Sequence, residues 1–147
     1  MHPARTEPAA ARIAGLLGLD RADQMTDLDL AVTVGEGLGV EAFDSLEQAF
    51  GGASDIRSVV SEPTLRRARQ ARRPLSREHS ERLYELGRVL DAALRAYGDD
   101  RARAEAFLMR PHPLLRGQRP FDVAITSSAG ADAVVGLIGR AAAGVAL

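Results

Sequence analysis

The 147-residue sequence contains no cysteine, no lysine and no tryptophan. Without cysteine the chain can form no disulfide, no thiolate nucleophile and no cysteine-ligated zinc site. Its three histidines, His2, His79 and His112, lie far apart and fit no metal-ligand spacing. All nineteen basic residues are arginine, and with so many Ala and Gly residues the simplest source of this bias is a GC-rich genome. We therefore expect no metal site.

The short motifs of common catalytic chemistry are also missing. There is no Gly-x-Ser-x-Gly, no glycine-rich phosphate loop ending in Lys-Ser/Thr, no His-Glu-x-x-His and no Gly-x-Gly-x-x-Gly after a strand. Ser127 and Ser128 fit helix caps better than nucleophiles, because no histidine has an evident reason to lie beside them. Glu78, Glu81 and Glu85 fit one solvated helix face better than a catalytic pair. The sequence therefore predicts neither an enzyme nor a cofactor.

No segment has the pattern of a secretion or membrane signal. The stretch 1–15 lacks the uninterrupted apolar region of a signal peptide. The segment 127–147 is long enough to span a bilayer, but Asp132, Arg140 and four glycines oppose its insertion. We expect a soluble cytoplasmic protein with no membrane partner.

Charge is nearly balanced overall but unevenly distributed. Residues 1–56 carry ten acids and three arginines, whereas residues 57–77 carry seven arginines and one acid, and residues 78–147 carry nine of each. A basic island between an acidic and a balanced block predicts local contact with an anion.

Hydrophobic residues recur at intervals of three and four, which predicts an all-α fold. No alternating run of Val, Ile and Thr indicates a strand. The length suits one domain or two small ones, and we place a boundary at 73–75, where Pro74 interrupts the chain. The two units are then 1–74, with its first eight residues disordered, and 75–147. Helices are expected over about 9–17, 27–38, 40–50, 54–60, 62–73, 76–97, 100–110 and 127–147, with a short turn at 121–125.

The helix expected over 62–73 carries most of the basic island. Its polar side chains project on one side, opposite Leu65, Ala68 and Ala71. The candidate DNA-binding residues on that side are Arg66, Arg67, Arg69, Gln70 and Arg73. Behind a short helix and a tight turn, this pattern is typical of a helix-turn-helix, in which arginine contacts phosphate or guanine and glutamine contacts adenine. The alternative is a solvated arginine face, and the turn at 59–61 lacks the usual glycine.

The helix expected over 127–147 has one wide apolar face and one face of small residues. The apolar face comprises Ala131, Val134, Val135, Leu137, Ile138, Ala142 and Val145. The opposite face comprises Asp132, Gly136, Gly139, Arg140 and Ala143. This pattern fits a core helix, and it also fits a helix that docks on a partner.

A series of motifs punctuates the second half of the chain. They are Leu75 with Ser76; Ser80, Arg82 and Leu83; Gly98 with Asp99; Ala104 before Phe107, Leu108 and Pro111; Leu115, Arg116 and Gly117; Pro120, Phe121 and Asp122; Gly130 with Val134; and Gly144 with Val145. In this order they resemble the toxin-binding domain of the Xre/ParS/MbcA antitoxins across residues 75–147, with Phe107 and Leu108 in place of the usual Trp-Leu. The first half is similar to the Xre-like helix-turn-helix domain of that family, though more divergent.

The resemblance implies an antitoxin that neutralises a RES-domain toxin, which consumes NAD or transfers ADP-ribose from it. It also implies a homodimer and repression of its own operon through operator DNA. We hypothesise that the end of the last helix enters the toxin's NAD pocket, because it is small, apolar and ends in a carboxylate. The candidate toxin-binding residues are Arg140, Ala141, Ala143, Gly144, Val145, Ala146 and Leu147. The alternatives are a DNA-binding regulator without a toxin partner and a helical adaptor for another protein.

Overall fold

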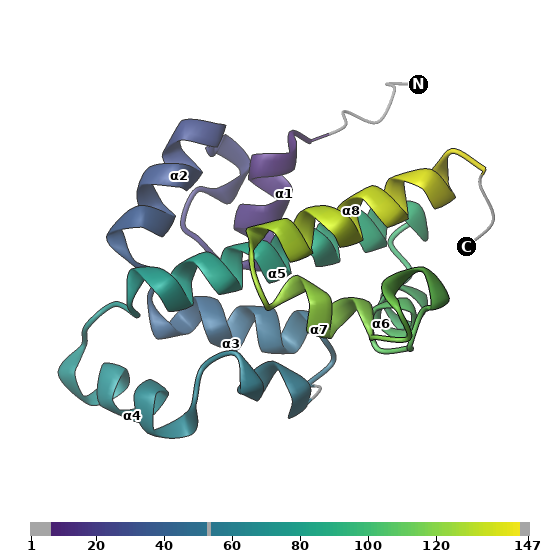
Figure 1. Ribbon diagram of the computed structural model, residues 1–147. Coiled ribbons are helices and arrows are strands. Elements are labelled where there is room, and N and C mark those ends of the chain that lie inside the picture. The colour runs from purple at the N-terminus through teal and green to yellow at the C-terminus, as the bar shows by residue number, and fades with distance from the viewer. Residues whose placement is uncertain (1–6, 53, 145–147) are drawn as a thin grey trace.

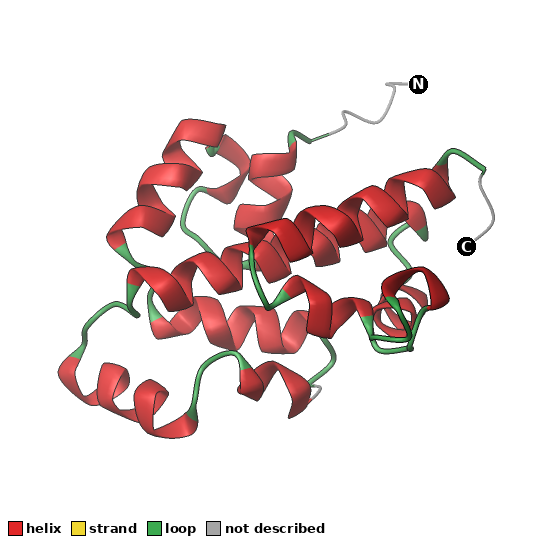
Figure 2. Cartoon of the chain, viewed as in Figure 1, coloured by secondary structure: helices red, strands yellow, loops and turns green. Residues whose placement is uncertain are grey.

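A computed structural model describes residues 7–52 and 54–144, which fold into helices joined by short turns (Figure 2). The all-α fold class is confirmed, since these residues form no strand. The α-helices of this part are α1 (Ala9–Leu16), α2 (Asp27–Glu36), α3 (Val40–Ala49), α4 (Glu62–Ala71), α5 (Arg77–Ala96), α6 (Arg101–Leu108), α7 (Pro120–Ala124) and α8 (Ser128–Ala142). The 3-10 helices are η1 (Ala22–Gln24), η2 (Ser54–Ser58) and η3 (Pro113–Leu115). Residues 1–6, most of the segment expected to be disordered, lie outside the described residues.

Side-chain caps begin most of the longer helices, as their sequence predicts. At α2, Thr26 accepts a hydrogen bond from the Asp29 amide, and the Asp29 carboxylate accepts one from the Thr26 amide. Each of the other capping side chains accepts a bond from the amide three residues on. These caps are Ser61 (α4), Ser76 (α5), Asp100 (α6) and Ser127 (α8).

Most helices are shorter than the periodicity predicts, and three show the physical reason or the largest change. Helix α4 ends at Ala71, because Arg72 adopts a left-handed conformation with φ of 51°, and Arg73 therefore lies beyond the helix. Helix α8 ends at Ala142, because the chain turns at Gly144, where φ is 86°. Ala142, expected on the apolar face, is exposed there. In place of the helix expected over 54–60, the chain forms the short 3-10 helix η2, which is followed by a turn at 59–60 before Ser61.

The 20-residue helix α5 lies at the centre of the molecule (Figure 1). It packs against α1, α2 and α3 and also against α6, α7 and α8, and α8 runs along it in the same direction (Figure 1). Its core stripe is Leu83, Leu86, Val89, Leu90 and Ala93, all fully buried. On the side of α1, the buried Asp91 accepts a hydrogen bond of 2.8 Å from Arg12 Nε. Helix α5 therefore joins the elements before and after it.

The boundary at 73–75 stays a prediction, but the core is continuous across it. One cluster of buried side chains extends from Ala10 in α1 to Ile138 in α8. In the α2–α3 connection, Leu38 is bound through both of its backbone groups: its amide donates to Ser80 Oγ at 2.8 Å, and its carbonyl accepts from the Leu75 amide at 2.7 Å. The start of α5 is thus attached to the N-terminal helices.

Candidate interaction surfaces

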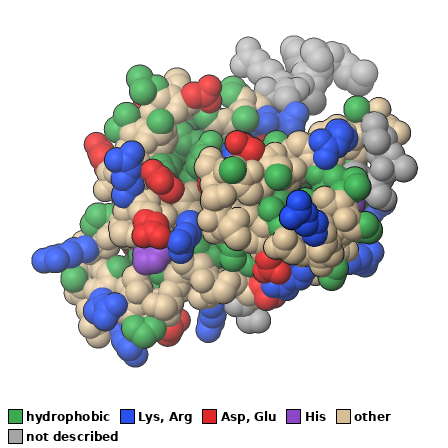
Figure 3. Space-filling model, viewed as in Figure 1, with side chains coloured by type: hydrophobic (Ala, Val, Ile, Leu, Met, Phe, Trp, Pro, Cys, Tyr) green, Lys and Arg blue, Asp and Glu red, His purple; other side chains and the backbone are tan. Residues whose placement is uncertain are grey.

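Helix α4 projects from the edge of the molecule and presents the predicted DNA-binding residues to solvent. Leu65 is its only buried side chain, while Ala68 is half-buried and Ala71, expected in its apolar footprint, is exposed. Figure 3 shows arginine side chains gathered over this helix. We call the exposed residues Arg66, Arg67, Gln70 and Arg73 the α4 surface. The order of elements here is that of a helix-turn-helix: η2, a turn at 59–61, and then α4. The first helix of that motif is replaced by the short 3-10 helix η2.

Arg69 differs from the other candidates on α4 because it is paired. Its guanidinium donates two hydrogen bonds to Asp44 of α3, from Nη1 at 2.8 Å and from Nη2 at 2.6 Å. These bonds raise the pKa of Arg69 above its ordinary value. A bidentate pair of this kind occupies the guanidinium face that would otherwise contact a phosphate. Arg69 thus links α4 to α3.

A hollow of about 760 Å³ lies between the end of α4 and the start of α5. Arg67, Gln70 and Arg73 line it from one side, and Ser76 and His79 line it from the other. The remaining lining residues are Thr64, Ala68, Ala71, Pro74 and Leu75, so the hollow has no acidic lining. Sequence reasoning did not include Ser76 and His79, because they lie on a different helix and Ser76 was assigned to capping.

The end of α8 presents the predicted toxin-binding residues that the structure describes. Arg140, Ala143 and Gly144 are exposed and Ala141 is half-buried, while Val145, Ala146 and Leu147 lie outside the described residues. The preceding part of the helix is anchored through Ala131, Val134, Leu137 and Ile138, which are buried. The core interpretation of the helix therefore holds for its first three turns, and its end remains accessible.

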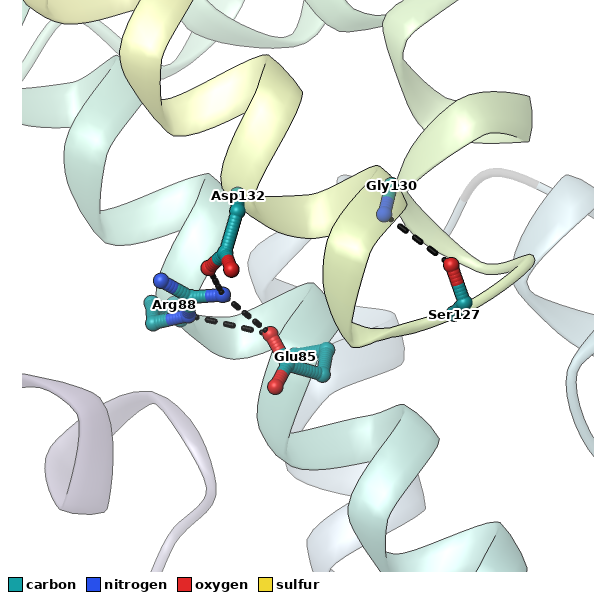
Figure 4. Close-up of polar contacts among 5 residues, drawn as sticks. All are labelled: Glu85, Arg88, Ser127, Gly130 and Asp132. Atoms are coloured by element: carbon teal, nitrogen blue, oxygen red, sulfur yellow. Dashed lines mark hydrogen bonds and ion pairs between the residues drawn. The ribbon is translucent and has the colours of Figure 1, made fainter.

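A polar clamp fixes the start of α8 on α5 (Figure 4). Arg88 of α5 donates from Nη2 to Asp132 of α8 at 2.6 Å and to Glu85 at 2.7 Å. Burial disfavours the charged form of Arg88, but the hydrogen bonds to Asp132 and Glu85 outweigh it, so its pKa is raised. Beside this clamp, Ser127 Oγ accepts from the Gly130 amide at 3.0 Å and completes the helix cap (Figure 4).

Gly130 allows α7 to approach the first turn of α8. A Cβ atom at this position would collide with the Val123 carbonyl oxygen and would lie 2.7 Å from Thr126 Oγ1. Those two groups are themselves bonded, since Thr126 Oγ1 donates to the Val123 carbonyl at 2.7 Å. The turn between α7 and α8 therefore requires glycine here.

Helix α7 is tied in turn to η2 of the N-terminal half. Arg119 donates to both carboxylate oxygens of Asp122 at 2.8 Å and from Nη1 to Asp55 at 3.3 Å. The hydrogen bonds from Arg119 lower the pKa of Asp122 below its ordinary value. This tie holds the start of α7, and the clamp holds the start of α8, against the rest of the fold.

Large apolar side chains are exposed at only three positions among the described residues: Leu28, Val32 and Leu114. Leu28 and Val32 lie one turn apart on α2, and we call them the α2 ridge. The helix also borders a groove of about 880 Å³ between α2, α5 and the α7–α8 turn, whose apolar lining includes Leu30, Val34, Tyr84 and Val135. The lining of this groove includes neither Leu28 nor Val32, so the α2 ridge lies outside it on another face of α2.

The part of the chain that the structure describes holds neither a membrane-spanning helix nor a cluster of metal ligands. None of its helices is both long enough and apolar enough to cross a membrane. Its His, Asp and Glu side chains form no group of three or more that could hold a metal ion.

The comparison with protein families agrees with the motifs of the C-terminal half. Residues 93–144 match the family model of the antitoxin Xre/MbcA/ParS C-terminal toxin-binding domain. This range comprises the last turn of α5, the helices α6, α7 and α8, and the exposed end of α8 up to Gly144. No curated protein matches the chain. The resemblance is therefore confirmed over residues 93–144, which form a toxin-binding domain of the Xre/MbcA/ParS antitoxin family, and this domain supports an antitoxin role for the protein.

Proposed function

We propose that this antitoxin neutralises a RES-domain toxin, one that consumes NAD or transfers ADP-ribose from it, by placing the end of α8 in the toxin's NAD pocket. The observation that carries the proposal is the contrast along α8. Its first three turns are buried and clamped by Arg88, whereas Arg140, Ala143 and Gly144 are exposed. An exposed segment on a fixed base loses little conformational freedom on binding, which favours affinity.

The composition of the last residues also suits a narrow cleft. Between Ala141 and Leu147 every residue is Ala, Gly, Val or Leu, so no charged side chain would have to be desolvated inside the toxin. Full burial of Val145 and Leu147 would contribute about 1.5–3 kcal/mol each. A contribution of this size is large enough to decide whether the toxin is inhibited at equal dose.

Deletion of residues 144–147 tests this mechanism. The shortened protein should keep its fold, because the buried part of α8 ends before the deletion, and it should lose neutralisation of its RES-domain toxin partner. NAD loss and cell growth on co-expression measure the effect. Deletion of residues 2–5, which removes the same length at the other end, is the matched control. Full neutralisation by the 144–147 deletion would show that the end of α8 does not block the pocket.

A second function, operator DNA binding and repression of its own operon, is favoured by the α4 surface. If this surface contacts DNA, Arg66→Ala should weaken binding of DNA from upstream of the coding region by about tenfold and flatten its salt dependence.

Asp44→Ala should strengthen DNA binding, because it releases Arg69 from an exposed ion pair that contributes at most about 1 kcal/mol to stability. Fluorescence anisotropy at several salt concentrations measures both. Equal affinities for all three proteins would exclude α4 from DNA binding.

The α2 ridge supports a homodimer as the assembled form of the antitoxin. A two-fold contact brings the same face of two copies together, and Leu28 and Val32 place two exposed apolar side chains on one face of α2. Neighbouring exposed apolar residues are typical of protein-binding surfaces. A cytoplasmic location agrees with these partners, since NAD-consuming toxins and operator DNA are found there.

A further inference from the structure

The hollow between α4 and α5 is lined by cationic and neutral polar groups over a small apolar floor. We propose that it binds a single phosphate group, held by Arg67, Arg73 and His79. The inference does not rest on the antitoxin role. It joins His79 of α5 to Arg67 and Arg73 of the α4 surface in one site, which recognises a phosphate and not a base sequence.

The two arginines of the hollow, Arg67 and Arg73, have no carboxylate partner among the described residues. Around it, Arg69 pairs with Asp44, and Arg77 pairs with Glu81 at 3.1 Å. Arg67 and Arg73 form no ion pair with any residue between 7 and 144 that the structure describes. A guanidinium that lacks a carboxylate can offer its parallel N–H groups to a phosphate, whose oxygens match their spacing.

The backbone brings the two walls of the hollow together. Arg72 ends α4 in a left-handed conformation and Pro74 prevents its continuation, so the chain reverses before α5 begins. The next residue, Leu75, is buried and its amide donates to Leu38. The start of α5 is therefore fixed by the core, and the wall that carries Arg73 lies against it.

His79 occupies a defined place in the second wall. Its ring is half-buried, and its Nδ1 lies 3.1 Å from Ser76 Oγ, which also caps its backbone amide. With Nδ1 engaged on its own helix, Nε2 is the ring nitrogen that can contact a ligand. The hollow thus combines two guanidinium groups with an oriented imidazole and contains no acid to repel an anion.

The phosphate could come from a nucleic acid backbone or from solution, and two measurements on the full chain distinguish these sources. Anisotropy of a fluorescent 20-base-pair duplex of arbitrary sequence reports backbone binding. Amide NMR shifts on titration with inorganic phosphate report binding of the free ion. The variants are Arg73→Gln and His79→Gln, and Arg110→Gln is the matched control because Arg110 is an exposed arginine on another face without an ion pair to a described residue.

We expect Arg73→Gln to weaken phosphate-dependent binding about tenfold, His79→Gln to weaken it to a smaller extent, and Arg110→Gln to change it less than twofold. Shifts confined to residues 64–79 with inorganic phosphate, and no duplex binding, would support a site for a soluble phosphate. Duplex binding that is weakened by Arg73→Gln and not by Arg110→Gln would support a backbone phosphate. Equal losses in Arg73→Gln and Arg110→Gln, or no binding of either probe, would overturn the proposal. A failure here leaves the 144–147 deletion experiment unaffected.

Discussion

At the scale of single residues, the strictest requirement in the toxin-binding domain falls on Gly130. Because a methyl group there would collide with the Val123 carbonyl, Gly130→Ala should destabilise the protein by about 1–3 kcal/mol. Chemical denaturation followed by circular dichroism measures the free energy of unfolding.

A second glycine of the same helix provides the control for this prediction. A Cβ at Gly139 would meet nothing within 4 Å, so Gly139→Ala should stabilise the protein by about 0.5–1 kcal/mol through the higher helix propensity of alanine. If Gly130→Ala were as stable as Gly139→Ala, the close packing of α7 on α8 would not hold in solution.

Single residues also show which contacts a sequence reveals. The caps Thr26, Ser61 and Ser127 were predictable because each bonds to an amide three residues away. The pairing of Arg69 with Asp44 was not predictable, because Asp44 lies 25 residues earlier on another helix. The sequence alone shows that arginines are concentrated in and just after α4, but tertiary packing decides which of them remain without a carboxylate partner.

At the scale of elements, the ion pair between Arg119 and Asp122 at the start of α7 makes stability depend on pH. The hydrogen bonds from Arg119 hold the pKa of Asp122 below its ordinary 3.8. A lowered folded-state pKa stabilises the fold above the unfolded-state pKa, near 4, and this stabilisation is lost as the pH falls through the folded-state value. Asp122→Asn should therefore lower the melting temperature at pH 7, and the difference from the natural protein should shrink as the pH falls below about 4.

Thermal melts between pH 3 and 7 test this prediction. Asp20→Asn is the control, because Asp20 is exposed and bonds to no residue that the structure describes. A difference for Asp122→Asn that stayed constant down to pH 3 would mean that the ion pair with Arg119 contributes nothing to folding.

Helix boundaries show what periodicity can and cannot predict about elements. The apolar pattern placed the longer α-helices, but it gave α7 only as a short turn, did not predict η1 and η3, and extended α4 to Arg73 and α8 towards residue 147. Both helices end at a backbone reversal, at Arg72 with φ of 51° and near Gly144 with φ of 86°. Glycine at 144 was a visible stop signal, whereas a left-handed arginine has no such signature in the sequence.

At the scale of the whole molecule, the α2 ridge predicts how two copies associate. The unmodified protein should be a dimer at micromolar concentration, and Leu28→Asp should yield monomers, because a charge would replace an apolar side chain that is 72% exposed in one copy. Light scattering after size-exclusion chromatography measures the mass.

The matched control is Leu114→Asp, which introduces the same charge at the exposed leucine of η3, 62% exposed. It should leave the mass unchanged. Dimers that persist in Leu28→Asp, or an unmodified protein that is monomeric, would exclude the α2 ridge from self-association.

The division of the molecule was the least predictable of its features. Pro74 marks a change of composition, which suggested two units, yet the buried cluster passes through that point. The reason lies in Leu38 and Ser80, two residues 42 positions apart whose backbone and side-chain groups meet in the core. Composition describes neighbours along the chain and carries no information about such a contact.

The amide of Leu38 provides a reporter for the entire antitoxin. It is buried against Ser80 at the junction of the two halves, so its proton should exchange with solvent only when the molecule opens globally. A ligand that binds only the folded state slows such opening in proportion to its affinity and concentration. Hydrogen–deuterium exchange at this one position would therefore register DNA bound at α4 and toxin bound at α8 alike, although it touches neither.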